Sequence, residues 1–325
     1  MIGRHRHLIA LEDLSAEEIL EVLRLAVSMK EVLNRPLKKV PTLRGKAVVN
    51  LFFEASTRTR SSFETAAKIL SADALNWTSA GSSVSKGETL VDTARNLEAM
   101  RPDVLVIRHA SSGAPRLVAD RVGCAVVNAG DGAHEHPSQG LLDAFTLAEH
   151  FTRAAGKGAD APPDFGLIAG KTVAIVGDVS HSRVARSDLH GLRKLGARVR
   201  VCGPPTMIPP GIEQLGAEVH HSLQKALEGA DAVMMLRIQH ERIGDPLIPG
   251  TREYSKLWGL SAAKAEAWLA PGCCILHPGP INRGVELSPE VADGPRSVIL
   301  DQVQNGVAVR MAILYLLAGG AVADV

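Results

Sequence analysis

Short apolar runs alternate with amphipathic stretches along the whole 325-residue chain. Apolar runs bounded by polar or turn residues are typical of buried strands, whereas apolar positions spaced i, i+3, i+4 are typical of helices. The pattern predicts strands over Ala47 to Phe53, Ala74 to Thr78, Val104 to Arg108, Ala125 to Asn128, Thr172 to Val176, Val199 to Cys202, Glu218 to His220, Ala232 to Leu236 and Cys274 to Leu276.

Helical spacing occurs between these strands. It predicts helices around Phe63 to Leu70 and Leu90 to Leu97, one opening at Pro137, one over Ala16 to Val32 and a strongly apolar one over Val303 to Leu317. Proline suits a first helical turn because it has no N–H to leave unpaired. This alternation predicts an α/β fold with two domains, each a mainly parallel sheet flanked by helices, joined by interdomain helices.

The length supports two domains, since about 150 residues per domain is usual. Residues 154–163 are rich in small residues and helix breakers, which predicts an exposed connection. We expect a first domain over 1–150, completed by a C-terminal helix over 295–325, and a second domain over 151–294.

Composition and charge exclude several classes of protein. Lys plus Arg number 36 and Asp plus Glu 35, and this net charge of +1 argues against a nucleic-acid partner. Because no apolar run reaches the roughly 18 residues of a membrane span, no membrane association is expected. The four cysteines form no C-x-x-C pair, and no secretory signal follows the basic N-terminus. We therefore expect reduced thiols and a cytoplasmic location.

The strongest candidate for chemistry is the segment Ser56 to Arg60, Ser-Thr-Arg-Thr-Arg, which joins an apolar strand to a helix. Ser56 is placed to cap that helix, and unpaired N–H groups at a helix N-terminus suit a phosphate. An ordinary cap with solvated arginines is the alternative interpretation. The position directly after an apolar strand favours an anion site.

Three further arginines, Arg108, Arg183 and Arg237, also follow apolar runs, and ligands bind at the carboxyl ends of parallel strands. Arg108 has an alternative interpretation as part of a surface pair at the edge of the sheet, and Arg237 has one as an ordinary loop residue. The turn at Gly177 starts like a dinucleotide site but lacks the second and third glycines of G-x-G-x-x-G. It therefore favours a carboxylate-binding Arg183 over a nicotinamide or flavin cofactor.

Two polar segments complete the set. His134, Glu135 and His136 invite a metal hypothesis, but H-x-H alone is weak, and hydrogen bonding to a carbonyl is the better interpretation. The loop 82–88 carries Lys86 and is either a solvated loop or a lid for an anion. Fixed cations without an evident nucleophile suit a substrate that brings its own leaving group, so that catalysis is positioning and electrostatic stabilisation.

With these motifs in order along nearly its whole length, the chain resembles the catalytic chains of the aspartate carbamoyltransferase family. The matching segments are Ser56 to Arg60, Ser82 with Lys86 to Thr89, Arg108-His109, His136 to Gln139, Gly177-Asp178 with Arg183, Arg237 to Gln239, His277 to Pro280 and Gln302 to Ala312. The sister ornithine carbamoyltransferases typically carry H-C-L-P where this chain has His277-Pro278-Gly279-Pro280, which favours aspartate as the acceptor.

The resemblance implies transfer of the carbamoyl group of carbamoyl phosphate to L-aspartate in de novo pyrimidine biosynthesis, with no cofactor and no metal. It implies a carbamoyl-phosphate-binding first domain, an aspartate-binding second domain and a homotrimer with shared active sites. The turn 278–284 resembles that of members that associate with dihydroorotase. A trimer that works alone and a trimer with regulatory chains are the other two options.

The resemblance also implies site residues. By family position the catalytic residues are Arg58, Thr59, Lys86, Arg108 and His136. Carbamoyl phosphate is bound by Ser56, Thr57, Arg58, Thr59, Ser82, Lys86, Arg108, His136, Gln139, Pro278 and Gly279. Aspartate is bound by Lys86, Arg183, Arg237 and Gln239. Ser82 and Lys86 are the pair that a neighbouring subunit lends.

Two alternatives stay open from the residues. The acceptor could be ornithine, although its cationic side chain would be repelled by Arg237. The chain could also be an idle scaffold within an assembly, although a scaffold has no use for the retained arginines. A nicotinamide-binding oxidoreductase fails on the glycine pattern around Gly177.

Overall fold

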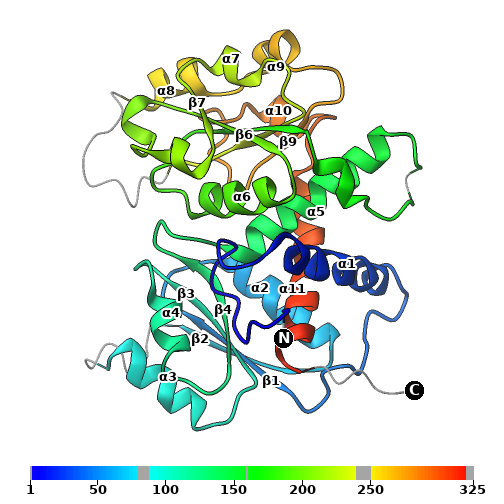
Figure 1. Ribbon diagram of the computed structural model, residues 1–325, viewed down its shortest axis with the longest axis vertical. Helices are drawn as coiled ribbons and strands as arrows, with labels where there is room; N and C mark the ends of the chain where they lie inside the picture. Colours follow the sequence, from blue (N-terminus) through cyan, green and yellow to red (C-terminus); the bar gives the residue numbers. More distant parts are fainter. Residues whose placement is uncertain (1, 79–87, 159, 239–249, 320–325) are drawn as a thin grey trace. The chain divides into compact units, whose positions relative to one another are not determined.

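The computed structural model describes residues 2–78, 88–158, 160–238 and 250–319. The chain divides into two compact units (Figure 1), and we describe each by itself. Unit 1 comprises Met1–Leu141 and Gln304–Val325, and unit 2 comprises Leu142–Val303. Both boundaries fall inside helices, the first in α5 (Pro137–Ala154) and the second in α11 (Ile299–Leu317).

Unit 1 contains a parallel four-stranded sheet with the order β2-β1-β3-β4. Its strands are β1 (Ala47–Phe52), β2 (Asp73–Thr78), β3 (Val104–His109) and β4 (Ala125–Asp131). Its helices are α1 (Ala16–Leu33), α2 (Thr57–Ile69), α3 (Leu90–Glu98) and α4 (Ala114–Ala119), together with the start of α5 and most of α11.

Alternate side chains of these strands enter different cores, as the period of two in a strand requires. Val49 and Leu51 of β1 pack in one cluster with residues of α3 and α4. Helix α2 packs against β1 and β2 and belongs to the other face (Figure 1). The guanidinium of Arg310 on α11 donates to Ser62 Oγ at 2.9 Å and lies 5.2 Å from the centre of the Phe63 ring. The last helix therefore packs onto α2 of unit 1.

Unit 2 contains a parallel five-stranded sheet with the order β7-β6-β5-β8-β9. Its strands are β5 (Thr172–Val176), β6 (Arg198–Cys202), β7 (Glu218–His220), β8 (Ala232–Met235) and β9 (Cys274–Leu276). Its helices are α6 (Arg183–Lys194), α7 (Leu223–Leu227), α8 (Thr251–Trp258), α9 (Ala262–Trp268) and α10 (Pro289–Ala292). One face of the sheet shares a core with α7, α9 and α10.

The two sheets are wound in the same way. In unit 1 the chain goes from β1 to its neighbour β2 and then crosses to β3 on the other side of β1. In unit 2 it goes from β5 through β6 to β7 and then crosses to β8 on the other side of β5. Each sheet thus has a point where the winding reverses, and open α/β sheets bind ligands at the carboxyl ends of the strands beside such a point.

The predicted fold class is confirmed, and each of the nine predicted strands is present within the described residues. The largest difference in a strand is at β4, which continues to Asp131 rather than ending at Asn128. Helix α11 begins at Ile299, ahead of the predicted Val303. The prediction for Ser56 is wrong in one respect: it occupies the N-cap position of α2, but its hydroxyl makes no capping hydrogen bond. Among the helices that the structure describes, none is both long and apolar enough to cross a membrane.

Candidate active site

The segment Ser56 to Arg60 lies beside the reversal point of the first sheet. Strand β1 ends at Phe52, and α2 begins at Thr57 after an extended Ser56 with φ −160°. Thr59 is buried in the first turn, where backbone N–H groups lack helical partners. Burial lowers the pKa of the Arg58 guanidinium, which nevertheless stays protonated because arginine titrates far above neutral pH. The first turn therefore combines N–H donors with fixed positive charge.

Arg108 is next to this turn because β1 and β3 are parallel neighbours. Phe52 pairs with Arg108 in the sheet register, and the Phe53 N–H donates to the Arg108 carbonyl at 2.9 Å. The guanidinium donates to Glu54 Oε1 at 3.0 Å and to the Ala129 carbonyl at 3.2 Å. These bonds orient a largely buried cation at the carboxyl edge of the sheet.

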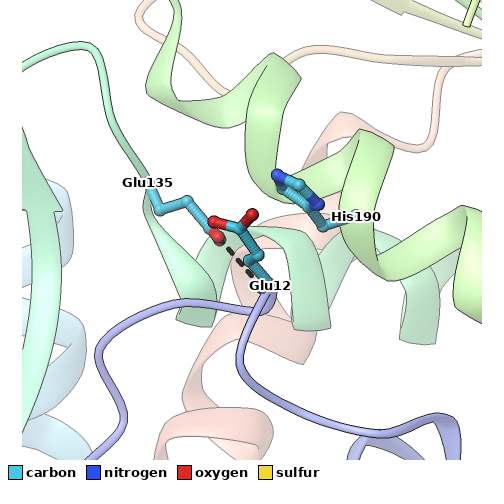
Figure 2. A group of neighbouring side chains, drawn as sticks. All are labelled: Glu12, Glu135 and His190. Atoms are coloured by element: carbon cyan, nitrogen blue, oxygen red, sulfur yellow. Dashed lines mark hydrogen bonds between the residues drawn. The ribbon is translucent and has the colours of Figure 1, made fainter. Parts of the chain in front are cut away.

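His136 and Gln139 are buried at the start of α5, which follows β4. The segment before them is anchored by Glu135, whose carboxylate accepts from Leu11 N at 2.9 Å and from Glu12 N at 3.0 Å. Figure 2 shows the bond between the Glu135 carboxylate and the Glu12 backbone. The N-terminal segment thereby fixes the backbone that leads into His136.

Asp131, at the end of β4, is a second buried acid near this segment. Its carboxylate accepts from Gly113 N at 2.7 Å and Asn128 Nδ2 at 2.8 Å, and lies 3.1 Å from His134 Nδ1. Burial alone would raise the pKa of Asp131, but the bonds from His134, Asn128 and Gly113 outweigh it and lower that pKa. The same bond to Asp131 raises the pKa of His134. His134 therefore acts as a partner of Asp131.

The reversal point of the second sheet carries Arg183 and Arg237. Gly177 follows β5 with a left-handed φ of +130°, and Ser182 caps α6 by accepting from Ala185 N at 3.2 Å. Arg183, the first residue of α6, is only 3% exposed. The Leu236 N–H donates to the Val176 carbonyl at 2.7 Å, which places half-buried Arg237 just past β8, the neighbour of β5.

The predicted residues Pro278 and Gly279 lie in the turn after β9, where Gly279 has φ +65°. The predicted residues Ser82, Lys86 and Gln239 lie outside the described residues. Within unit 1 the structure brings Ser56, Thr57, Arg58 and Thr59 to the same sheet edge as Arg108, and within unit 2 it brings Arg183 to the edge of Arg237.

Sequence reasoning missed the acids that hold these groups. Glu54 pairs with Arg108, Glu135 anchors the segment before His136, and Glu286 lies 3.2 Å from His277 Nε2. Glu54 lies two positions before Ser56, the first residue of the Ser56 to Arg60 motif, and that proximity was a usable signal. The partners of Glu135 and Glu286 depend on the fold, and the local pattern carries no sign of them.

Comparison with known proteins identifies the family of the chain. Residues 6–149 match the model of the carbamoyl-P binding domain of aspartate/ornithine carbamoyltransferase, and residues 169–317 match the Asp/Orn binding domain. An aspartate carbamoyltransferase catalytic subunit of Anaeromyxobacter dehalogenans (strain 2CP-C) is 79% identical over 99% of this chain and 98% of its own length. One from Syntrophotalea carbinolica is 56% identical over 98% of this chain and 97% of its own length.

Solved structures give the same answer at the level of the fold. Aspartate transcarbamoylase from Trypanosoma cruzi, in complex with carbamoyl phosphate, is 28% identical with a TM-score of 0.82, covering 95% of each chain. Ornithine carbamoyltransferase from Thermus thermophilus is also 28% identical, with a TM-score of 0.80, covering 96% of this chain and 99% of that one. The chain belongs to the aspartate/ornithine carbamoyltransferase family.

Proposed function

We propose that this chain is the catalytic chain of an aspartate carbamoyltransferase. It transfers the carbamoyl group of carbamoyl phosphate to the amine of L-aspartate, giving N-carbamoyl-L-aspartate and phosphate in de novo pyrimidine biosynthesis. The observation that carries the proposal is the placement of arginines at the reversal points of both sheets, Arg108 in unit 1 and Arg183 with Arg237 in unit 2. The names of the curated relatives support the same reaction.

Unit 1 is assigned the carbamoyl phosphate. Ser56, Thr57, Arg58 and Thr59 bind the phosphate through the first turn of α2, which supplies N–H donors and charge. Thr59, Arg108 and His136 donate to the carbamoyl oxygen, and Gln139 binds the carbamoyl amino group. The backbone of Pro278 and Gly279 adds contacts near the reacting carbon.

Unit 2 is assigned the aspartate. Arg183 and Arg237, together with Gln239, bind its two carboxylates, since two separated guanidiniums suit a dicarboxylate. Lys86 serves both substrates. With Ser82 it comes from a neighbouring subunit of a homotrimer with shared active sites. The trimer works in the cytoplasm, either alone or in a larger assembly with dihydroorotase or regulatory chains.

The reaction needs no protein nucleophile. The aspartate amine attacks the carbamoyl carbon, a new C–N bond forms, the C–O bond to phosphate breaks, and the departing phosphate can take the amine proton. Negative charge builds on the carbamoyl oxygen, where Thr59, Arg108 and His136 stabilise it. Losing one donor of this kind typically costs about 3 kcal/mol of barrier. Arg58 and Lys86 offset the charge on the leaving phosphate.

Ornithine as acceptor is the second candidate, because the family includes both enzymes and an ornithine carbamoyltransferase fits this fold as well as an aspartate enzyme does. The deciding experiment measures steady-state product formation from carbamoyl phosphate with each amino acid. We expect activity with aspartate and essentially none with ornithine. Preference for ornithine would refute the assignment of Arg237.

Two variants test the site itself. Arg58→Ala and Lys86→Ala are expected to abolish carbamoyl transfer while circular dichroism still reports a folded chain. Turnover close to that of the wild type in either variant would overturn the assignment of that residue.

A further inference from the structure

The turn that follows β9 is held by buried hydrogen bonds from a histidine and a glutamate. The side chains of His277 and Glu286 are both 0% exposed. The Gly279 N–H donates to His277 Nδ1 at 2.7 Å. Because a backbone N–H can only donate, Nδ1 is the unprotonated acceptor and the ring proton is on Nε2. That proton is donated to Glu286 Oε1, with 3.2 Å between the two atoms.

Glu286 ties down a second point of the same turn. Its Oε1 also accepts from the Asn282 N–H at 2.5 Å, so one carboxylate holds both the His277 ring and the Asn282 backbone. Glu286 is held in turn, because its carbonyl accepts from Leu260 N at 2.9 Å. The turn from His277 to Asn282 is therefore fixed at three places, the His277 ring, Gly279 N and Asn282 N.

The backbone of His277 is fixed from the other side by α11. The His277 N–H donates to Gln302 Oε1 at 2.9 Å, and Gln302 Nε2 donates to Asp143 Oδ1 at 2.6 Å. The segment just before α11 lies beside β9, since Ile275 N donates to the Arg296 carbonyl at 2.8 Å. Four buried side chains, from α5, α11 and the turn itself, thus set one short stretch of backbone.

We propose that His277 and Glu286 are positioning residues that aim the Pro278–Gly279 backbone at the carbamoyl group of carbamoyl phosphate. The proposal rests on the proposed function, which assigns that backbone to this substrate. A backbone that passes through a glycine at φ +65° is not rigid by itself, so outside bonds must set the direction of its carbonyls. Dipoles that are fixed before the substrate binds stabilise it without reorganisation.

The test compares the binding of carbamoyl phosphate with that of inorganic phosphate by titration calorimetry. Inorganic phosphate is assigned the same contacts as the phosphate group of carbamoyl phosphate, at the first turn of α2 and at Lys86. Only carbamoyl phosphate has the carbamoyl group that the Pro278–Gly279 backbone is assigned to contact. The ratio of the two Kd values does not depend on how much of a sample is active, so a general loss of folding leaves it unchanged. We expect Glu286→Ala and His277→Gln to reduce the preference for carbamoyl phosphate about tenfold, which corresponds to about 1.4 kcal/mol.

Conservative variants distinguish the effects of the two hydrogen bonds of the His277 ring, one with Glu286 and one with the Gly279 N–H. In Glu286→Gln the amide oxygen can still accept from both donors, so the ratio is expected to stay near that of the wild type. In His277→Asn the amide oxygen can replace Nδ1 as acceptor for Gly279, so this variant should be less impaired than His277→Gln. Arg283→Ala is the matched control, because Arg283 directly follows this turn and its exposed side chain pairs with Asp293.

Failure of this inference is distinguishable from failure of the proposed function. A ratio within twofold of the wild-type value in both Glu286→Ala and His277→Gln would overturn the positioning role, even with an active enzyme. If Glu286→Ala does not fold, His277→Gln decides by itself. If wild-type protein does not carbamoylate aspartate, the proposed function is wrong.

Discussion

Glu135 offers the sharpest test of how the candidate site is supported in unit 1. Its buried carboxylate accepts from Leu11 N and Glu12 N, at 2.9 Å and 3.0 Å. In Glu135→Ala both donors lose their acceptor. A hydrogen bond to a charged group contributes about 1.5–3 kcal/mol. Leu11 is fully buried, so water cannot replace its lost bond and the whole free energy of that bond is lost. The Glu12 bond is only partly buried, so water can compensate part of its free energy. The expected loss of unfolding free energy is about 2–4 kcal/mol.

The assay is urea unfolding followed by circular dichroism, together with hydrogen exchange of the Leu11 and Glu12 amides. Both amides should exchange faster in Glu135→Ala, because the bond that protects them is gone. Glu17→Ala is the control, since Glu17 is an exposed partner of Arg24 and such pairs contribute at most about 1 kcal/mol. We also expect kcat to fall, because His136 directly follows the anchored residue. Unchanged exchange at Leu11 in Glu135→Ala would refute the anchoring role.

Three further predictions concern stability and reactivity. Asp131 raises the pKa of His134 in the folded protein, so the contribution of protonated His134 to the free energy of unfolding is full below about pH 6.5 and is lost as pH rises through the raised pKa. The difference in unfolding free energy between wild type and His134→Gln should therefore shrink over that pH range. A difference that stays constant with pH would contradict this prediction. Arg310→Met should cost about 1–3 kcal/mol, and a double-mutant cycle with Ser62→Ala should show coupling above about 0.5 kcal/mol, since the pair is buried. Burial raises the pKa of the Cys124 thiol to about 11, so native protein at pH 8 should resist iodoacetamide, whereas urea-unfolded protein should react rapidly; equal rates would contradict the prediction.

Much of the fold is predictable because each buried parallel strand corresponds to a short continuous run of apolar residues in the sequence. The stretch from Thr172 to Val176 reads as a strand and is one, and Arg183 could be placed near its end from the local pattern. None of the predicted helix ranges covers the helices α4, α6, α7, α8, α9 and α10. For α7 and α10 the reason is their length, because five and four residues carry too little periodicity. The order of the strands was also invisible, since it depends on which side of β1 or β5 each crossover returns to.

The candidate site divides in the same way. Arg108 and Arg237 could be found because each directly follows an apolar run, whereas their buried supports could not. Glu135 bonds to Leu11, 124 positions away in the sequence, and Gln302 bonds to Asp143, 159 positions away. No local pattern encodes contacts at such separations. What the local pattern does encode is which side chains end up at the carboxyl edge of each sheet.

The division of α11 between the units has a consequence for synthesis on the ribosome. Unit 2 is a continuous stretch, Leu142–Val303, inserted into unit 1, whose last part begins at Gln304. Because Arg310 packs onto Ser62 and Phe63 of α2, unit 1 cannot be completed until α11 leaves the exit tunnel. During synthesis the face of α2 that carries Ser62 and Phe63 therefore stays uncovered until α11 has been made. Unit 2 begins later in the sequence than unit 1, yet all of its residues are synthesised before unit 1 is complete.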